Sequence, residues 1–178
     1  MKNLLILFLL AGIATGHAQV IQLDEAKVTN TAKILSDGDS RYIVLEDYNS
    51  QFMKNPIGFM KENFDIHLFI EDMEDQGYDF YVVEFRNRKG YLVANFDDRG
   101  ELLSTSQRFK NIPLPHAISR ELVSDYKGWS MTKNLYVASG KGDALDKEQY
   151  KITLKNGKSS QTVKIIPDRP SRGLASNE

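Results

Sequence analysis

Residues 78–109 read YDFYVVEFRNRKGYLVANFDDRGELLSTSQRF, and the pattern of these residues is the strongest indication of the fold. Apolar and polar side chains alternate in three runs: Tyr78 to Arg86, Gly90 to Asp97 and Glu101 to Phe109. Successive side chains of a strand point to opposite faces, so Tyr81, Val83 and Phe85 share one buried face. Glu84 and Arg86 then point the other way.

Polar turns that contain glycine separate the three runs. Arg88-Lys89-Gly90 lies between the first two and Asp98-Arg99-Gly100 between the last two, which predicts an antiparallel meander. The neighbouring acids Asp97 and Asp98 do not make a catalytic pair, because adjacent residues point in different directions. We interpret them as turn residues whose side chains hydrogen-bond the local backbone.

The residues after the meander predict one helix and three more strands. Ile112-Pro113-Leu114-Pro115 ends the third run, and apolar residues at helical spacing follow until about Gly128. The further strand-like runs are Trp129 to Ser139, Glu148 to Lys155 and Ser160 to Ile166. We expect a flexible loop from Ser139 to Asp146 and a tight turn at Asn156-Gly157.

The residues before the meander predict a β-hairpin and a helical cover. Asp37-Gly38 separates two extended segments between residues 23 and 47, which is a strong hairpin signal. Asn55-Pro56 has the residue types preferred at a helix start, and Asp65 can cap a second helix that ends near Gly77. We expect this pair of helices, or one bent helix, to cover a sheet.

The order hairpin, helix, three strands, helix, three strands indicates an α+β domain with an antiparallel sheet and helices on one face. A weak internal similarity links Tyr81-Val-Val-Glu-Phe85 with Tyr150-Lys-Ile-Thr-Leu154. Both are followed by a polar turn containing glycine and by a second strand. A duplicated helix-plus-sheet unit is therefore the economical interpretation, with chance similarity between strands as the alternative.

The first 18 residues have the three parts of a secretory signal peptide. Lys2 provides the positive start and Leu4 to Ala14 form the apolar run. Gly16 and Ala18 are small residues at the positions that a signal peptidase reads. The apolar run is shorter than the roughly 20 residues that cross a bilayer, so we expect cleavage rather than anchoring. The mature protein is then periplasmic or secreted and has no membrane span.

Composition limits the chemistry and the number of domains. The chain has no cysteine, which excludes disulfides and thiol catalysis and fits a bacterial envelope. Its 23 Lys and Arg nearly balance its 24 Asp and Glu, so we expect no nucleic-acid partner. We expect one domain over residues 19–167, with its hairpin at 23–47, followed by a disordered tail at 168–178.

Several of these motifs carry a resemblance to known exported domains. They are Tyr81-Val-Val-Glu-Phe85, Phe96-Asp-Asp-Arg-Gly-Glu101, Leu114-Pro115 and Tyr150-Lys-Ile-Thr-Leu154 with Asn156-Gly157. Over roughly residues 57–167 the chain resembles PepSY-like or β-lactamase-inhibitor-like (BLIP-like) domains. The resemblance implies a helix followed by an antiparallel sheet, often in tandem. It also implies a periplasmic or secreted binding module or inhibitor without a shared catalytic site.

An enzyme is the rival hypothesis. Similar short exported chains sometimes carry the name nicotinate-nucleotide adenylyltransferase, which implies a Rossmann-type parallel sheet and a His-x-Gly-His motif. The mature chain has only His67 and His116, far apart in the sequence, so the motif is missing. An exported hydrolase with a dispersed site is a second enzymatic hypothesis, and a structural envelope protein is a third, non-enzymatic one.

Candidate chemistry in the mature chain is sparse. Two histidines without cysteines do not make a zinc site, which usually needs three or four protein ligands. There is no Gly-x-Ser-x-Gly elbow, and Ser139-Gly140-Lys141-Gly142 lacks the spacing of a phosphate-binding loop. We therefore expect no catalytic residue, no cofactor and no metal.

A binding role is the expectation that the sequence favours. The sheet face away from the helices should present polar side chains of both charges, namely Glu84, Arg86, Asn95, Ser104, Ser106, Thr153 and Lys155. Trp129 and Tyr136 are the better contact candidates, because aromatic side chains dominate binding hot spots. With Lys141 and Arg86 they form the predicted contact set for an envelope or extracellular protein or peptide. Trp129 and Tyr136 can equally belong to the core.

The first testable expectation concerns processing. If residues 1–18 are a signal peptide, protein recovered from the envelope or medium begins within a residue or two of Gln19. Intact-mass measurement checks this. Recovery of a mature pool that still carries residues 1–18 would contradict it.

Overall fold

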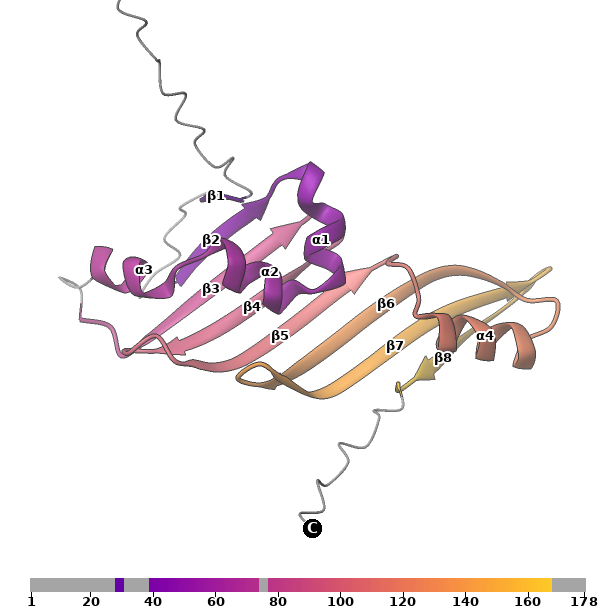
Figure 1. Ribbon diagram of the computed structural model, residues 1–178. Coiled ribbons are helices and arrows are strands. Elements are labelled where there is room, and N and C mark those ends of the chain that lie inside the picture. Colours follow the sequence, from indigo (N-terminus) through magenta and orange to yellow (C-terminus); the bar gives the residue numbers. More distant parts are fainter. Residues whose placement is uncertain (1–27, 31–38, 74–76, 168–178) are drawn as a thin grey trace, which may run out of the picture.

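The computed structural model describes residues 28–30, 39–73 and 77–167. Within these ranges, eight strands form one sheet in chain order (Figure 1). The strands are β1 (Val28–Asn30), β2 (Asp39–Val44), β3 (Phe80–Asn87), β4 (Gly90–Asp97), β5 (Leu102–Lys110), β6 (Ser130–Lys141), β7 (Ala144–Asn156) and β8 (Ser159–Ile165). The helices are a 3-10 turn, η1 (Glu46–Tyr48), then α1 (Asn49–Lys54), α2 (Pro56–Asn63), α3 (Ile66–Asp72) and α4 (His116–Asp125).

The sheet confirms the α+β class and is almost wholly antiparallel. β1 and β2 pair antiparallel, as the hairpin prediction requires, with Val28 opposite Val44. Only part of the predicted hairpin lies within the described residues, and its Asp37-Gly38 turn lies outside them. β2 pairs with β3 in parallel, because η1 and three helices carry the chain back between these strands. A single parallel pair is not the parallel sheet of a Rossmann-type enzyme.

One face of the sheet is buried and the other is not. In β3 the side chains of Tyr81, Val83 and Phe85 are buried, and their neighbours in the strand are only half-buried or exposed. The same alternation continues through β4, β5, β6 and β7, so the buried positions form one continuous face. We call this the helix face, because all four α-helices contribute buried side chains to the same core.

Aromatic side chains hold the first three helices on the helix face. Phe85 stacks on Tyr42 with the ring centroids 5.2 Å apart and meets Phe64 edge to face at 5.7 Å. Phe52 of α1 packs against Phe109 of β5 at 5.4 Å. These contacts join strands β2, β3 and β5 to the helical segment, and large buried aromatic rings contribute most to such a core.

The predicted helix starts and turns are confirmed by their hydrogen bonds. Asn55 Oδ1 accepts from Gly58 N at 3.1 Å, and Asp65 Oδ1 accepts from His67 N at 2.9 Å. These residues cap two separate helices, α2 and α3. Asn87 Oδ1 accepts from the backbone N–H of Lys89 and Gly90 in the turn between β3 and β4. Asp97 Oδ1 accepts from Arg99 N and Glu101 N in the next turn.

The prediction of a flexible loop from Ser139 to Asp146 is wrong. β6 continues to Lys141 and β7 begins at Ala144, so Gly142 and Asp143 form a tight turn. Gly140 lies inside β6, where a Cβ atom would stand 1.8 Å from the carbonyl oxygen of Ala144. The glycines therefore permit a close hairpin rather than a loop. Asp143 also pairs with Lys61 of α2.

The duplicated order is present, but the predicted sequence repeat does not mark equivalent strands. A helical segment precedes β3, β4 and β5, and α4 precedes β6, β7 and β8. Residues 81–85 lie in the first strand of their set and residues 150–154 in the middle strand of theirs. Their similarity reflects a shared requirement for large apolar side chains on the helix face. No helix of the described ranges has the length and apolar character needed to cross a membrane.

Phe85 tests the assignment of the two faces. Its side chain is fully buried, so Phe85→Ala should lower the free energy of unfolding by about 3 to 5 kcal/mol. Val123→Ala is the control, because the Val123 side chain is 75% exposed and its loss should change stability by less than about 0.5 kcal/mol. Urea unfolding measures both. Equal effects of the two substitutions would show that the faces are assigned wrongly.

Candidate functional site

A groove of about 540 Å³ lies on the helix face between the two helical segments. Figure 1 shows α1 and α2 near one end of the sheet and α4 near the other. The groove runs between α1 and the Ile112–Pro115 segment, which joins β5 to α4. We call it the tyrosine groove, because Tyr136 of β6 and Tyr150 of β7 line it. It is the part of the helix face that the helices leave open.

The floor of the tyrosine groove consists of side chains from three neighbouring strands. Tyr136 and Tyr150 are opposite each other in the register of β6 and β7, and their ring centroids are 4.9 Å apart. Both are largely buried, and so is Gln107 of β5 beside them. An aromatic floor with an amide at its side offers apolar contact area and hydrogen bonding at one place.

Glu148 places a carboxylate next to the two tyrosines. It precedes Tyr150 by two residues, so strand alternation puts both side chains on the helix face. Burial and the Glu148 charge together raise the pKa of Tyr150 to about 12. Burial, the charge of Glu148 and a hydrogen bond to it also raise the pKa of Tyr136. Both hydroxyls therefore stay protonated at neutral pH and remain able to donate a hydrogen bond.

The wall opposite α1 is fixed by a pair of asparagines. Asn134 is 4% exposed, and its side chain accepts from Ile112 N at 3.2 Å and donates to Ile112 O at 2.8 Å. Asn111 has φ 54°, and its Oδ1 accepts from Asn134 N at 3.2 Å. Asparagine tolerates this left-handed backbone better than most residues. The reciprocal bonds hold the start of the proline-containing segment against β6.

The rest of the lining is mainly apolar. Met53 and Pro56 come from the α1 and α2 side, and Leu114 comes from the opposite wall. Lys54 lies at the exposed rim. The groove thus combines apolar walls with a few polar groups, Gln107, Glu148 and the tyrosine hydroxyls, which is the usual composition of a binding site.

The structure does not bring the four predicted contact residues together. Tyr136 lies in the tyrosine groove, whereas Trp129 precedes β6 and is partly buried against the core. Lys141 is exposed at the other end of β6, roughly 40 Å from Trp129 at the rise of an extended strand. The four residues therefore do not form one site.

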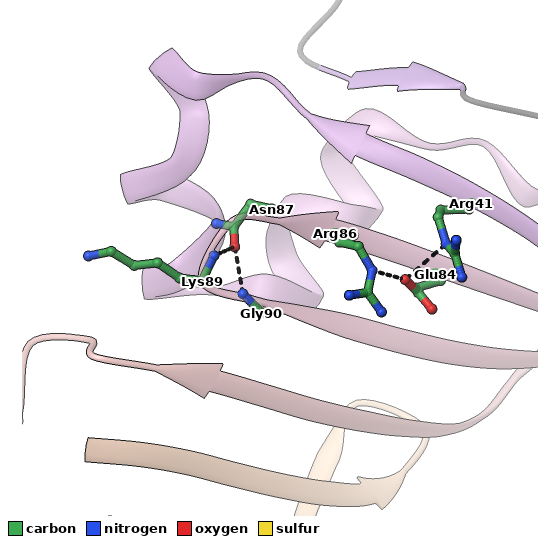
Figure 2. A network of polar contacts seen from close by, with 6 residues as sticks. All are labelled: Arg41, Glu84, Arg86, Asn87, Lys89 and Gly90. Carbon is green, nitrogen blue, oxygen red and sulfur yellow. Dashed lines mark hydrogen bonds and ion pairs between the residues drawn. The ribbon is translucent and has the colours of Figure 1, made fainter. Parts of the chain in front are cut away.

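Arg86 lies on the sheet face opposite the helices, which we call the open face. Figure 2 shows it beside Glu84, whose carboxylate also pairs with Arg41 at 3.1 Å. The Arg86 guanidinium lies 5.0 Å from the ring centroid of Tyr91. The hydrogen bond to Glu84 raises the pKa of Arg86, so it is charged at any ordinary pH. Two arginines thus share one carboxylate on this face.

Sequence reasoning misses Tyr150, Glu148 and Gln107 as groove residues. In the sequence Tyr150 is indistinguishable from a core position, and nothing around Gln107 sets it apart from other strand residues. The available signal is the alternation in the predicted strand from Glu148 to Lys155, which places Glu148 on the same face as Tyr150. Carboxylates are rarely fully buried. A carboxylate among the apolar residues that point to the helix face therefore indicates a place where the helices do not cover that face.

The histidines lie apart from the tyrosine groove. His67 is exposed on α3, and the exposed His116 has its Nδ1 atom 3.1 Å from a side-chain nitrogen of Arg120. Within the described part of the chain, no group of three or more His, Asp or Glu side chains could hold a metal ion.

Comparison with protein-family models, with curated proteins and with solved structures finds no match for this chain. The inference of function therefore rests on the geometry of the groove and of the open face.

The buried tyrosines predict a specific dependence of stability on pH. Because the pKa of Tyr150 is raised to about 12, its contribution is fully present below pH 10 and declines as the pH rises toward that value. Tyr150→Phe removes the titrating group, so its urea midpoint should fall less steeply between about pH 9.5 and 11.5 than that of the parent protein. Parallel profiles for the two proteins would contradict this prediction.

Proposed function

We propose that this chain is an exported, non-catalytic binding module whose tyrosine groove holds an extended segment of a protein partner. The observation that carries the proposal is the Tyr136 and Tyr150 pair, lying 4.9 Å apart on the floor of an open groove beside a carboxylate. Tyrosine is enriched in binding hot spots, because it gives a large contact area together with a hydroxyl group.

An extended peptide suits the shape and the chemistry of the groove. Met53 and Leu114 offer apolar contacts on opposite sides, and Gln107 can hydrogen-bond a peptide backbone through its amide. Glu148 can accept from backbone N–H groups or from a lysine or arginine side chain. A peptide segment without regular structure exposes its backbone N–H and carbonyl groups and its side chains, so it can contact both the walls and the floor of the groove.

The protonation of the groove supports binding rather than catalysis. A general base needs a pKa near the working pH, whereas the pKa of Tyr136 and that of Tyr150 are raised far above neutrality. Within the residues that the structure describes, the groove lining contains no histidine to act with Glu148 or with Ser50, the serine of the lining. The Tyr150 hydroxyl can donate a hydrogen bond to a ligand, and the Tyr136 oxygen, whose proton is shared with Glu148, can accept one.

Export is part of the proposal and rests on the sequence. Residues 1–18 have the pattern of a signal peptide, and export of a chain without disulfides fits a bacterial envelope. The resemblance to PepSY-like and β-lactamase-inhibitor-like domains agrees with a binding role. An exported hydrolase, an adenylyltransferase and a structural envelope protein are the rival functions.

Selection from a displayed library of random peptides tests the groove. The selected peptide is synthesised, and its affinity is measured by titration calorimetry against the chain starting at Gln19. Leu114→Asp places a charge on the apolar wall and should weaken binding at least about tenfold, as expected for a buried contact residue. Val123→Asp is the matched control, because Val123 is an exposed residue of α4 outside the groove lining, and it should leave the affinity unchanged.

Three results would overturn the proposal. Failure to select any peptide would leave the groove without a role, and equal effects of Leu114→Asp and Val123→Asp would place the peptide elsewhere. Pyrophosphate release from ATP and nicotinate mononucleotide in a parallel assay would favour the adenylyltransferase instead. Circular dichroism of both variants confirms that they are folded before affinities are compared.

A further inference from the structure

The open face of strands β5 to β8 is strongly basic, although the whole chain has a net charge of −1. Besides Lys141 and Lys147 near the turn between β6 and β7, strand alternation places six cations there: Arg108, Lys110, Lys133, Lys151, Lys155 and Lys164. We call these six residues the basic face. The positions around them on this face, from 104 to 110, 133 to 139, 147 to 155 and 160 to 164, include no Asp or Glu. Glu148 lies on the other side of the sheet.

The register concentrates these charges further. Lys110 is opposite Leu135, Leu135 is opposite Lys151, and Lys151 is opposite Lys164. Directly paired residues of neighbouring strands are about 5 Å apart, so Lys151 and Lys164 are like charges at short range. Such a pair destabilises a sheet. The six cations form no ion pair with any residue that the structure describes.

The basic face continues into a hollow near the turn between β3 and β4. This hollow has a volume of about 250 Å³, and Arg86, Arg88, Lys89, Arg108 and Lys110 line it. Glu84 and Glu46 pair with Arg86 and Arg88, and Lys89 Nζ donates to the backbone oxygen of Asn111. The carbonyl does not neutralise Lys89, and Arg108 and Lys110 form no ion pair within the described residues, so a single anionic group would meet three cations without a carboxylate partner there.

We propose that the basic face docks on the surface of an anionic phospholipid bilayer. Five of the six cations are lysines, which bind as point charges rather than through paired hydrogen bonds to one acceptor. They extend over four strands, a width of roughly 15 Å, and Leu135 and Val137 lie half-buried between them. A broad field of point charges matches a surface of many mobile phosphate headgroups. The hollow would hold one such headgroup.

This docking does not depend on the tyrosine groove, which lies on the opposite face of the sheet. The two sites would be used together: the basic face orients the protein on the bilayer, and the groove then faces away from the lipid toward a partner. The basic face and the tyrosine groove share no side chain, so loss of vesicle binding and loss of peptide binding can be observed independently.

Sedimentation with lipid vesicles tests the proposal. The chain starting at Gln19 contains the whole described sheet, and it should bind vesicles of phosphatidylcholine with about 30% phosphatidylglycerol but not vesicles of phosphatidylcholine alone. Because the attraction is electrostatic, about 0.5 M NaCl should release the protein. The triple variant Lys110→Glu, Lys151→Glu and Lys164→Glu should lower the partition coefficient at least about tenfold.

A control variant with the same change of net charge distinguishes the effect of the basic face on vesicle binding from the effect of the total charge of the protein. Arg99→Glu, Arg120→Glu and Lys127→Glu change exposed side chains of the turn between β4 and β5, of α4 and of the residues just after it, all outside the open face, and together should lower the partition coefficient by less than about twofold. Lys164→Glu alone creates an opposite-charge pair with Lys151, so it should keep or raise the melting temperature while weakening vesicle binding. That variant gives a readout that misfolding cannot imitate.

Two outcomes with vesicles would overturn the proposal: equal binding to both lipid compositions, or an equal loss of binding in the two triple variants. Binding to soluble polyglutamate or to DNA, with no binding to vesicles, would replace the bilayer by an acidic protein or a nucleic acid.

Discussion

The fold depends on one packing constraint: helices cover one face of a single sheet, and no helix of the described residues covers the other. Phe85 is fully buried on the covered face, where it contacts Tyr42 of β2 and Phe64 after α2. Because side chains alternate along every strand, covering one face commits half of the positions in β3 to β7 to the core. The other half of the positions point to the open face and pack against no helix of the described ranges, so charged side chains are tolerated there.

Both candidate sites follow from this constraint. The helices α1 to α3 and α4 occupy separate parts of the helix face, and the apolar positions between them remain as the floor of the tyrosine groove. Asn134 fixes the groove's outer wall by bonding both backbone groups of Ile112. On the open face no helix of the described ranges competes for space, so cations from the neighbouring strands β5 to β8 assemble without a structural cost other than their mutual repulsion.

The sequence predicts the strands and helices because their signals are local. Alternation within residues 78–109 and the caps Asn55 and Asp65 are read from neighbouring residues. The prediction for Ser139 to Asp146 is wrong because glycine marks both loops and close strand approaches. The parallel pairing of β2 with β3 and the charge of the basic face depend on which strands become neighbours. Composition averages that charge to near zero, so the sequence shows the basic face and the groove only through the alternation within the predicted strands.

The absence of cysteine allows the two-faced sheet to be tested directly, since any introduced thiol is the only one in the chain. Single-cysteine variants at Thr105 and Ile152 of the helix face and at Ser106 and Lys151 of the open face can be compared by their rate of reaction with a thiol reagent. Cysteines at 106 and 151 should react rapidly in the native protein, and those at 105 and 152 only after unfolding. Rapid reaction at all four positions, or the reverse pattern, would contradict the account.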